Sequence, residues 1–188
     1  FQVSGGDNRL DAHVLGALRD ALLHVVRNSV AHGIEPESTR VSRGKPPAGK
    51  VDLVVERRGN QVAFICRDDG RGIDLEAVRR AAARRGLISE AQARSVTLDQ
   101  AIQLLLKGGV STTGVVTEMS GRGIGLDVVR ETAARFKGTV ALKTEPGRGT
   151  SLEVVVPVSL SAMPALVMDA GGVIVSAPLD AVRGALRL

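Results

Sequence analysis

Aromatic residues are nearly absent from this 188-residue sequence, which has three Phe and neither Trp nor Tyr. Because 44% of the residues are hydrophobic, the chain can still build a sizeable core, but that core must be aliphatic. Proteins that bind single-stranded nucleic acids stack the bases on aromatic side chains. The scarcity of aromatics therefore argues against a nucleic-acid partner, although the net charge of +5 and the pI of about 10.1 are typical of one.

Cysteine and long apolar runs are also scarce. The single cysteine, Cys66, excludes an internal disulfide and fits a reducing compartment, so we expect a cytoplasmic location. It lies in an apolar, strand-like run, which predicts a buried structural thiol rather than a reactive one. No apolar run reaches the roughly 18–20 residues of a membrane span, and no zinc-ligand spacing is present. We do not expect a signal peptide. Because the sequence starts at Phe1, we expect a piece of a longer protein.

The positions of apolar and turn residues predict a series of helices and strands. Helices are expected over 10–32, 75–85, 98–106 and 124–136, and strand pairs over 51–57 with 61–67 and 139–144 with 151–156. A polar loop over 40–50 and a small-residue loop over 108–120, a candidate mobile loop, complete the pattern. This order suits a two-layer α/β sandwich with the helices on one face of a mixed sheet.

Two further short strands are predicted at 166–168 and 173–175, within residues 158–188. About thirty residues are too few to build a separate hydrophobic core. This tail is therefore either a hairpin appended to the sandwich or the start of a truncated second domain.

The first polar motif lies on the predicted helix 10–32, where His24, Asn28 and His32 are spaced four residues apart and share one face. The amide oxygen of Asn28 is a hard donor that suits Mg²⁺ beside phosphate oxygens. His24 can orient water or substrate, or take a proton near neutral pH, and His32 can meet a phosphate. The same spacing is also that of the solvent face of an amphipathic helix.

The second motif, D-D-G-R-G at 68–72, directly follows a predicted strand. The carboxylate of Asp68 can accept a hydrogen bond there from an exocyclic amine such as that of adenine. Gly70 and Gly72 allow the backbone to turn and leave room for a flat ring. Taken alone, a plain Asp-Gly turn after a hairpin is the commoner explanation.

The third motif, G-R-G-I-G at 121–125, places bare backbone N–H groups at the start of a predicted helix, which makes an anion site. It differs from the dinucleotide-binding fingerprint because its third glycine is Gly125 rather than residue 126, and the sequence has no Walker A motif. The competing interpretation is a flexible lead-in to the helix.

In this order, four stretches closely resemble the N, G1, lid-plus-G2 and G3 boxes of the CheA-type chemotaxis histidine kinases, members of the GHKL superfamily. The stretches are H-V-V-R-N-S-V-A-H-G-I-E at 24–35, D-D-G-R-G-I-D at 68–74, G-V-S-T at 109–112 with V-T-E-M-S-G-R-G-I-G-L-D-V-V at 116–129, and G-R-G-T-S-L-E-V-V-V-P at 147–157. The resemblance covers about residues 3–157.

The resemblance implies a Bergerat-type α/β sandwich over 1–157, a site for ATP and Mg²⁺, and transfer of the γ-phosphate to a histidine on a separate phosphotransfer domain. It implies as further partners a response regulator and a CheW-like coupling protein with its chemoreceptor array, and dimer formation through a domain outside this chain. Residues 158–188 resemble the beginning of the SH3-like regulatory domain that binds the coupling protein. Direct membrane insertion is not expected.

The resemblance also assigns roles to individual residues. His24 and Asn28 match the catalytic polar residues of the N box, with Asn28 as the Mg²⁺ ligand, and Asp68 matches the adenine-binding carboxylate. The other residues that it places around the nucleotide are His32, Gly70, Gly72, Ile73, Ser111, Thr112, Ser120, Gly121, Arg122, Gly123, Ile124, Gly125, Leu126 and Thr150.

The chain departs from the usual boxes at three places. Ala31 stands where the N box usually has Asp, the lid stretch at 108–112 lacks its usual Pro and Phe, and Ala77 and Ala81 stand where Lys is common. Two alternatives to a histidine autokinase therefore stay open. One is a degenerate module that binds ATP weakly and acts as a regulatory or docking platform. The other is an ATPase that drives dimer clamping, although such proteins use Glu at the position of His24.

Overall fold

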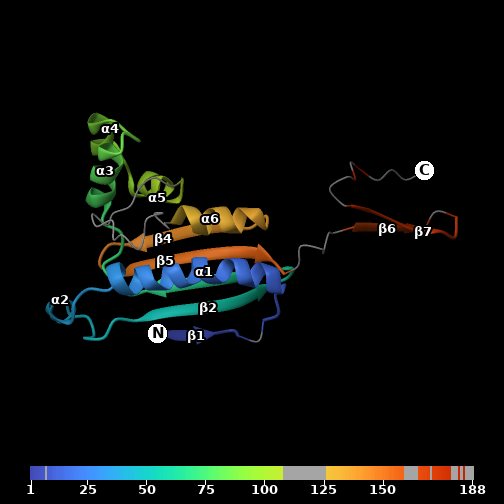
Figure 1. Ribbon diagram of the computed structural model, residues 1–188, viewed down its shortest axis with the longest axis horizontal. Helices are drawn as coiled ribbons and strands as arrows, with labels where there is room; N and C mark the ends of the chain where they lie inside the picture. The colour runs from blue at the N-terminus through green and yellow to red at the C-terminus, as the bar shows by residue number, and fades with distance from the viewer. Residues whose placement is uncertain are drawn as a thin grey trace.

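The computed structural model describes residues 1–6, 8–107, 126–158, 165–169, 171–178, 182 and 184. A five-stranded sheet with helices packed against it forms the main body, and a second, two-stranded sheet follows toward the C-terminus (Figure 1). No helix in these ranges is long and apolar enough to cross a membrane.

The large sheet has the strand order β1-β2-β3-β5-β4, with β1 parallel to β2 and the other neighbours antiparallel. Gly59, in the turn between β2 and β3, has a φ of +64°, which glycine adopts without steric cost. Both predicted hairpins are confirmed, whereas the three-residue strand β1 is too short to show alternation and was not predicted. The strands are β1 (Gln2–Ser4), β2 (Val51–Arg58), β3 (Gln61–Asp68), β4 (Thr139–Glu145) and β5 (Gly149–Pro157).

The helical layer covers one face of this sheet, where α1 and α6 lie (Figure 1). Leu18 of α1, Val62 of β3 and Val154 of β5 are fully buried between the layers, in a core that is almost entirely aliphatic. The expected two-layer α/β sandwich is therefore confirmed. The helical elements are α1 (Ala12–Asn28), the π-helical turn η1 (Ser29–Gly33), α2 (Glu37–Ser42), α3 (Leu75–Arg84), α4 (Glu90–Ser95), α5 (Leu98–Lys107) and α6 (Leu126–Arg135).

A smaller hydrophobic cluster joins α3 and α5, and is built around Val78 and Leu105. As predicted, Asp74 caps α3 by accepting a hydrogen bond from the Ala77 N–H. The short helix α4 was not predicted, although Ser89 and Gln92 form a capping box at its start. Six residues contain too little periodicity to show a helix in the sequence.

Two predicted segments have a different structure. The helix expected over 10–32 is α-helical only through Asn28 and continues as η1, where the Ile34 N–H donates to the Ser29 carbonyl at 2.9 Å. The segment expected as a polar loop over 40–50 begins inside α2, and its first residue, Arg40, is 0% exposed. The charge of Arg40 tolerates burial because Glu35 and Asp69 pair with it.

Cys66 lies in β3 with 3% of its surface exposed, as expected for a structural thiol. Burial raises its pKa to about 11, and a hydrogen bond with Ser29 opposes this shift only in part. The thiol is therefore protonated at neutral pH and is a poor nucleophile.

The two short strands expected in the tail are also present, as β6 (Ala165–Asp169) and β7 (Ile174–Pro178). They pair in antiparallel fashion on either side of a turn in which Gly171 and Gly172 have positive φ. Apolar side chains of this hairpin are exposed, including Val167 at 64% and Ile174 at 69%.

Candidate functional site

The first predicted motif lies at the C-terminal end of α1, where His24 and Asn28 contact each other. The Asn28 Nδ2 atom lies 2.8 Å from His24 Nε2. An amide nitrogen can only donate, so Nε2 accepts and the neutral imidazole has its proton on Nδ1. This bond uses the amide nitrogen, so the amide oxygen is the atom with which Asn28 can bind a metal ion.

The surroundings of His24 lower its pKa below the usual value. Burial is the main cause and Arg27 adds to it, whereas Asp127, in the first turn of α6, acts in the opposite direction. The neutral ring that results is required for the bond to Asn28, because a protonated imidazole has no acceptor nitrogen.

His24 also lines a cavity of about 390 Å³ between α1 and α6. The cavity is therefore bounded by the helix that carries the first motif and by the helix that follows the third. Its lining residues are Ala17, Asp20, Ala21, Leu23, His24, Arg27, Val128 and Thr132.

The π-helical turn changes how His32 relates to the other two polar residues. A π-helix has more residues per turn than an α-helix, so His32 is rotated away from the single stripe expected for a continuous α-helix. His32 is exposed but still close enough to His24 to lower its pKa. The hydroxyl of Ser29, at the start of the π-turn, hydrogen-bonds to Asp68.

Asp68, the last residue of β3, is held by two backbone groups and this hydroxyl. Its Oδ1 accepts from the Gly70 N–H at 3.1 Å and from the Thr150 N–H at 3.2 Å. Thr150 reaches this position because it pairs with Asp68 in the register of β3 and β5. Residues from the predicted N, G1 and G3 boxes thus meet at one carboxyl group.

The pKa of Asp68 is raised, chiefly by burial. The hydrogen bonds from Gly70, Ser29 and Thr150 favour the ionised form and limit this rise. Both backbone donors lie at Oδ1, and because a carboxylate can accept about four hydrogen bonds, Asp68 keeps acceptor capacity for a ligand. The carboxyl is therefore held in one orientation and is incompletely solvated, as a recognition group needs to be.

The glycines beside Asp68 are required by close contacts between chain segments. A Cβ on Gly70 would lie 2.2 Å from the Gly33 carbonyl oxygen, and one on Gly149 would lie 1.9 Å from that of Asp68. Gly72 has a φ of +75°, and its Cβ would lie 2.7 Å from the Glu145 oxygen. Neighbouring backbone fills these directions, so packing of the chain against itself is sufficient to require glycine at 70 and 72. The expected room for a flat ring stays a prediction.

Thr144 of β4 links the turn after Asp68 to the start of β5 through its hydroxyl group. Its Oγ1 accepts from the Ile73 N–H at 2.9 Å, donates to the Gly149 carbonyl at 3.1 Å, and lies 3.3 Å from the Thr150 hydroxyl. Neither Thr144 nor Ser29 was predicted as a site residue. Ser29 follows Asn28 directly in the N-box stretch, whereas the contacts of Thr144 depend on the pairing of β4 with β5.

The predicted lid and phosphate loop fall outside the part of the chain that the structure describes. Leu126 is the first residue of α6, and it packs against both hydrophobic clusters. The loop expected over 108–120 lies outside the described residues, as do Ser111, Thr112, Ser120, Gly121, Arg122, Gly123, Ile124 and Gly125.

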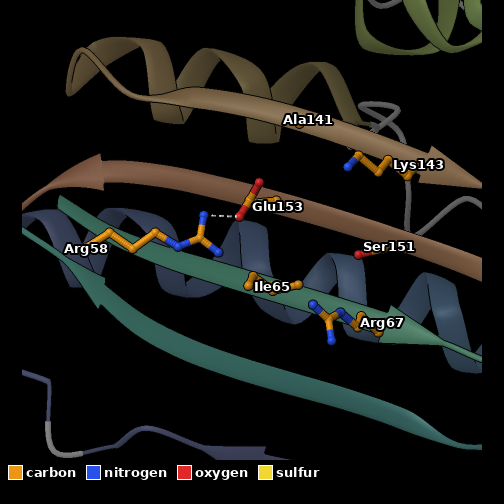
Figure 2. A pocket seen from close by; sticks show the side chains of 7 residues that line it. All are labelled: Arg58, Ile65, Arg67, Ala141, Lys143, Ser151 and Glu153. Carbon is orange, nitrogen blue, oxygen red and sulfur yellow. Dashed lines mark hydrogen bonds and ion pairs between the residues drawn. The ribbon is translucent and has the colours of Figure 1, made fainter.

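A second cavity, of about 350 Å³, lies on the sheet face away from α1 (Figure 2). Arg67 lies next to the core residue Cys66 in β3, so its side chain points to the opposite face. None of the predicted site residues within the described ranges lines this cavity. Its lining residues are Arg58, Ile65, Arg67, Ala141, Lys143, Ser151 and Glu153.

The chain is similar to known proteins over almost its whole length. The chain is 37% identical over 186 residues to the gliding motility regulatory protein of Myxococcus xanthus, and the matched region covers 99% of this chain and 24% of that protein. It is 36% identical over 188 residues to the chemotaxis protein CheA of Halobacterium salinarum, covering 100% of this chain and 28% of that protein. The chain thus spans about a quarter of the length of these relatives.

A solved histidine kinase domain from the Erythrobacter litoralis EL346 blue-light activated histidine kinase aligns with a TM-score of 0.49 and 14% identity, covering 84% of this chain and 53% of that one.

Residues 17–160 match the family described as histidine kinase-, DNA gyrase B-, and HSP90-like ATPase. That range includes His24, Asn28, Asp68 and Thr150 and most of the two-layer sandwich. The chain belongs to the histidine kinase-, DNA gyrase B-, and HSP90-like ATPase family.

Proposed function

We propose that this chain is the ATP-binding catalytic domain of a CheA-like histidine autokinase, and that it transfers the γ-phosphate of ATP to a histidine on a separate phosphotransfer domain. The observation that carries the proposal is the environment of Asp68, whose Oδ1 is bound by the Gly70 and Thr150 N–H groups. A fixed carboxylate that can still accept a further hydrogen bond suits the exocyclic amine of adenine. Guanine has a carbonyl at that position, so ATP is preferred over GTP.

The proposed metal ligand is Asn28. Among the described residues, no group of three or more His, Cys, Asp or Glu side chains can hold a metal ion. Mg²⁺ does not need such a group, because it commonly binds one or two protein oxygens and completes its octahedron with phosphate oxygens and waters. The Asn28 amide oxygen, oriented by the bond to His24, fits this requirement. Bound Mg²⁺ neutralises negative charge on the phosphate oxygens during transfer.

The phosphate acceptor is proposed to lie outside this chain. His13 is in the first turn of α1, eleven residues before His24 and thus about 16 Å away along the helix. Its ring packs edge-on against Phe136, with the centroids 5.8 Å apart. In-line transfer needs the nucleophile within roughly 3–3.5 Å of the phosphorus. His24 lies on the helix face that is proposed to assist transfer, and His32 lies in η1, which continues that helix.

Two measurements distinguish the proposal from its alternatives: calorimetric titration with ATP and Mg²⁺, and incubation with labelled ATP. The chain alone should bind ATP and stay unlabelled, and label should appear on an added phosphotransfer domain. Binding without transfer would favour the regulatory or docking module, for which Ala31 in the N box is the supporting observation. Release of phosphate without transfer would favour the ATPase, and acid-labile label on His13 would contradict the proposed division of labour.

The same proposal covers location and partners. The names of the two curated relatives support a role in motility signalling, and therefore a cytoplasmic kinase that works with a response regulator and a CheW-like coupling protein at a chemoreceptor array. We further propose that residues 158–188 begin a second domain. The exposed apolar side chains of β6 and β7 support this, because such surfaces are normally covered in a folded domain.

A further inference from the structure

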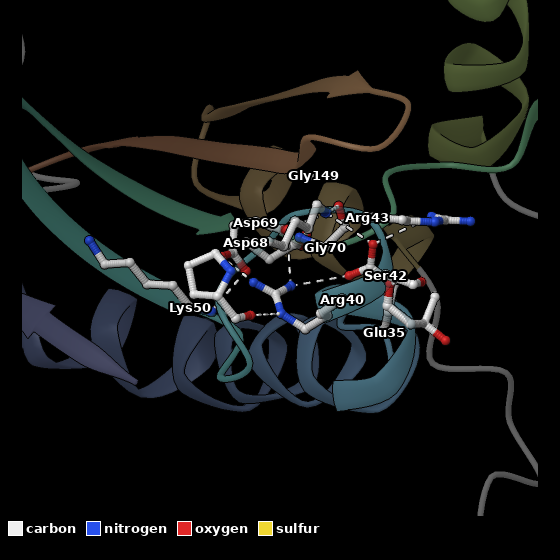
Figure 3. A network of polar contacts seen from close by, with 12 residues as sticks. Glu35, Arg40, Ser42, Arg43, Lys50, Asp68, Asp69, Gly70 and Gly149 are labelled. Carbon is white, nitrogen blue, oxygen red and sulfur yellow. Dashed lines mark hydrogen bonds and ion pairs between the residues drawn. The ribbon is translucent and has the colours of Figure 1, made fainter.

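A buried polar cluster lies beside the turn that carries Asp68, in the segment that the sequence indicated as an exposed loop. Figure 3 shows Arg40 between Glu35 and Asp69, next to Asp68 and Gly70. Lys45 also belongs to this cluster, through its contact with Glu35. Arg40 and Glu35 are 0% and 4% exposed, so the cluster belongs to the interior of the protein.

Arg40 uses its guanidinium to join three chain segments. It donates to Glu35 Oε2 at 3.1 Å and to Asp69 Oδ2 at 2.7 Å, and its Nε donates to the Pro46 carbonyl at 2.8 Å. The other oxygen of Asp69 accepts from the Lys50 N–H at 2.8 Å. The segment 35–50 is thereby fixed against the end of β3.

Lys45 binds the turn itself. Its Nζ donates to the carbonyl of Asp69 at 2.8 Å, to the carbonyl of Gly70 at 2.7 Å, and to Glu35 Oε1 at 2.9 Å. Burial alone would raise the pKa of Glu35, but Lys45 and Arg40 outweigh burial, so that pKa is lowered and Glu35 is ionised. The carboxylate compensates the charges of the buried Arg40 and the partly exposed Lys45.

These carbonyls matter because a trans peptide group is planar, with its N–H pointing opposite to its C=O. The peptide whose carbonyl belongs to Asp69 has the Gly70 N–H at its other side, and that N–H donates to Asp68 Oδ1. The next peptide has its Gly70 carbonyl on Lys45 and its Arg71 N–H on the Gly33 carbonyl, at 2.9 Å. Both peptides are therefore held from both sides, and one of them orients Asp68.

We propose that Lys45 is a positioning residue for nucleotide recognition: by holding the carbonyls of Asp69 and Gly70, it aims the Gly70 N–H at Asp68 and sets that carboxylate for the adenine amine. This inference rests on the proposed function, since it assigns to Asp68 the recognition of adenine. Arg40 shares one of these carbonyls, because its Nη1 also donates to that of Asp69, at 3.3 Å, whereas the Gly70 carbonyl accepts from Lys45. Arg40 and Glu35 further support Lys45 by fixing the segment from which it projects.

The test compares Lys45→Met with Lys50→Met in the otherwise unchanged chain. Met keeps the length of the side chain and removes its charge. Lys50 is a matched control because its side chain is 65% exposed and its Nζ pairs with Asp52. Lys50 contacts Asp69 through its backbone N–H, which the substitution keeps. Three quantities are measured well below the unfolding temperature: the affinities for ATP and for GTP, and the hydrogen-exchange rate of the Gly70 amide without nucleotide.

Lys45→Met is expected to weaken ATP binding about tenfold and GTP binding less, so that the preference for adenine falls. It should also speed exchange of the Gly70 amide, and Lys50→Met should change none of these. A Lys45→Met variant that unfolds at lower temperature but keeps the affinity, the preference and the exchange rate would overturn the proposal, as would equal losses in both variants. If the parent chain binds no nucleotide, the proposed function fails, and the exchange rate of Gly70 alone decides whether Lys45 positions the turn.

Discussion

The two ends of the proposed nucleotide site are built in different ways. At the adenine end, backbone N–H groups of Gly70 and Thr150 hold Asp68, and Lys45 fixes the turn behind it. At the phosphate end, the described residues contribute a single side-chain pair, His24 and Asn28, on a half-exposed helix face. One end is therefore held by contacts among several chain segments, and the other is a pair of side chains on one helix.

This difference corresponds to what each end has to bind. A flat base presents few polar atoms, so its recognition needs an acceptor that is already in place. A metal ion and a triphosphate have strong charges and bind water, so the protein needs to supply few oxygens. We therefore expect changes at the phosphate end to alter the chemistry with little effect on folding, and changes at the adenine end to alter both.

We expect Asn28→Ala to give the largest difference between the effect on phosphoryl transfer and the effect on stability. Removing the proposed metal ligand should lower phosphoryl transfer at least about a hundredfold, because transfer depends on metal-bound phosphate. Thermal unfolding and metal-free nucleotide binding should stay close to those of the parent. Asn60→Ala, which removes an exposed amide from the β2–β3 turn, is the control. Full transfer by Asn28→Ala would remove the assignment of the phosphate end.

Asp68→Asn tests whether the adenine end sacrifices stability for recognition. Because folding raises the pKa of Asp68, its protonated form is favoured in the fold, and that stabilisation is lost as the pH rises through the folded-state pKa. At pH 7 the variant should therefore be slightly more stable without nucleotide. It should also lose about 1.5–3 kcal/mol of ATP binding, the range for hydrogen bonds to charged groups.

The control for this variant is Asp52→Asn, a carboxylate on the far face of the sheet whose partner is Lys50. It should leave ATP binding unchanged. A parent chain that binds GTP as well as ATP, or an Asp68→Asn variant with normal ATP affinity, would contradict the role of Asp68.

Gly70→Ala tests the contact between the turn and η1. The new methyl group would lie 2.2 Å from the Gly33 oxygen, so we expect a loss of about 1–3 kcal/mol of unfolding free energy together with weaker ATP binding. Gly16→Ala in α1, where nothing lies within 4 Å, should instead stabilise the fold by about 0.5–1 kcal/mol. Equal effects of the two substitutions, measured by denaturant unfolding, would mean that the turn and η1 do not touch.

Acidification should give the smallest effect, at the phosphate end. The pKa of His24 is lowered in the fold, so its contribution to stability is present above the unfolded value of about 6.5 and is lost as the pH falls through the folded-state pKa. Protonation removes the acceptor for Asn28, and the pair should separate. NMR titration of the His24 ring should give a midpoint below 6.5, with the Asn28 amide signals moving at the same pH. Asn28 amide signals that do not move as His24 titrates would contradict their bond.

The sequence by itself determined the longer elements of the fold and most residue types of the candidate site. The apolar stripe of α1, the turn at Gly59 and the helix cap Asp74 are set by residues a few positions apart, so they can be recognised along the chain. The same holds for the pairing of His24 with Asn28, which is one helical turn. The motifs around Asp68 were found because their residue types suit a nucleotide. The contacts between these motifs were not predicted.

Tertiary structure alone decided what surrounds those motifs. Nothing near Arg40 and Lys45 in the sequence distinguishes them from exposed loop residues, yet one is fully buried and the other binds two carbonyls at the end of β3. Thr150 reaches Asp68 across 82 positions of sequence, through the register of two strands. The physical reason is range: helix and turn preferences act over a few residues, but the burial of a charge depends on partners that only folding brings within hydrogen-bond distance.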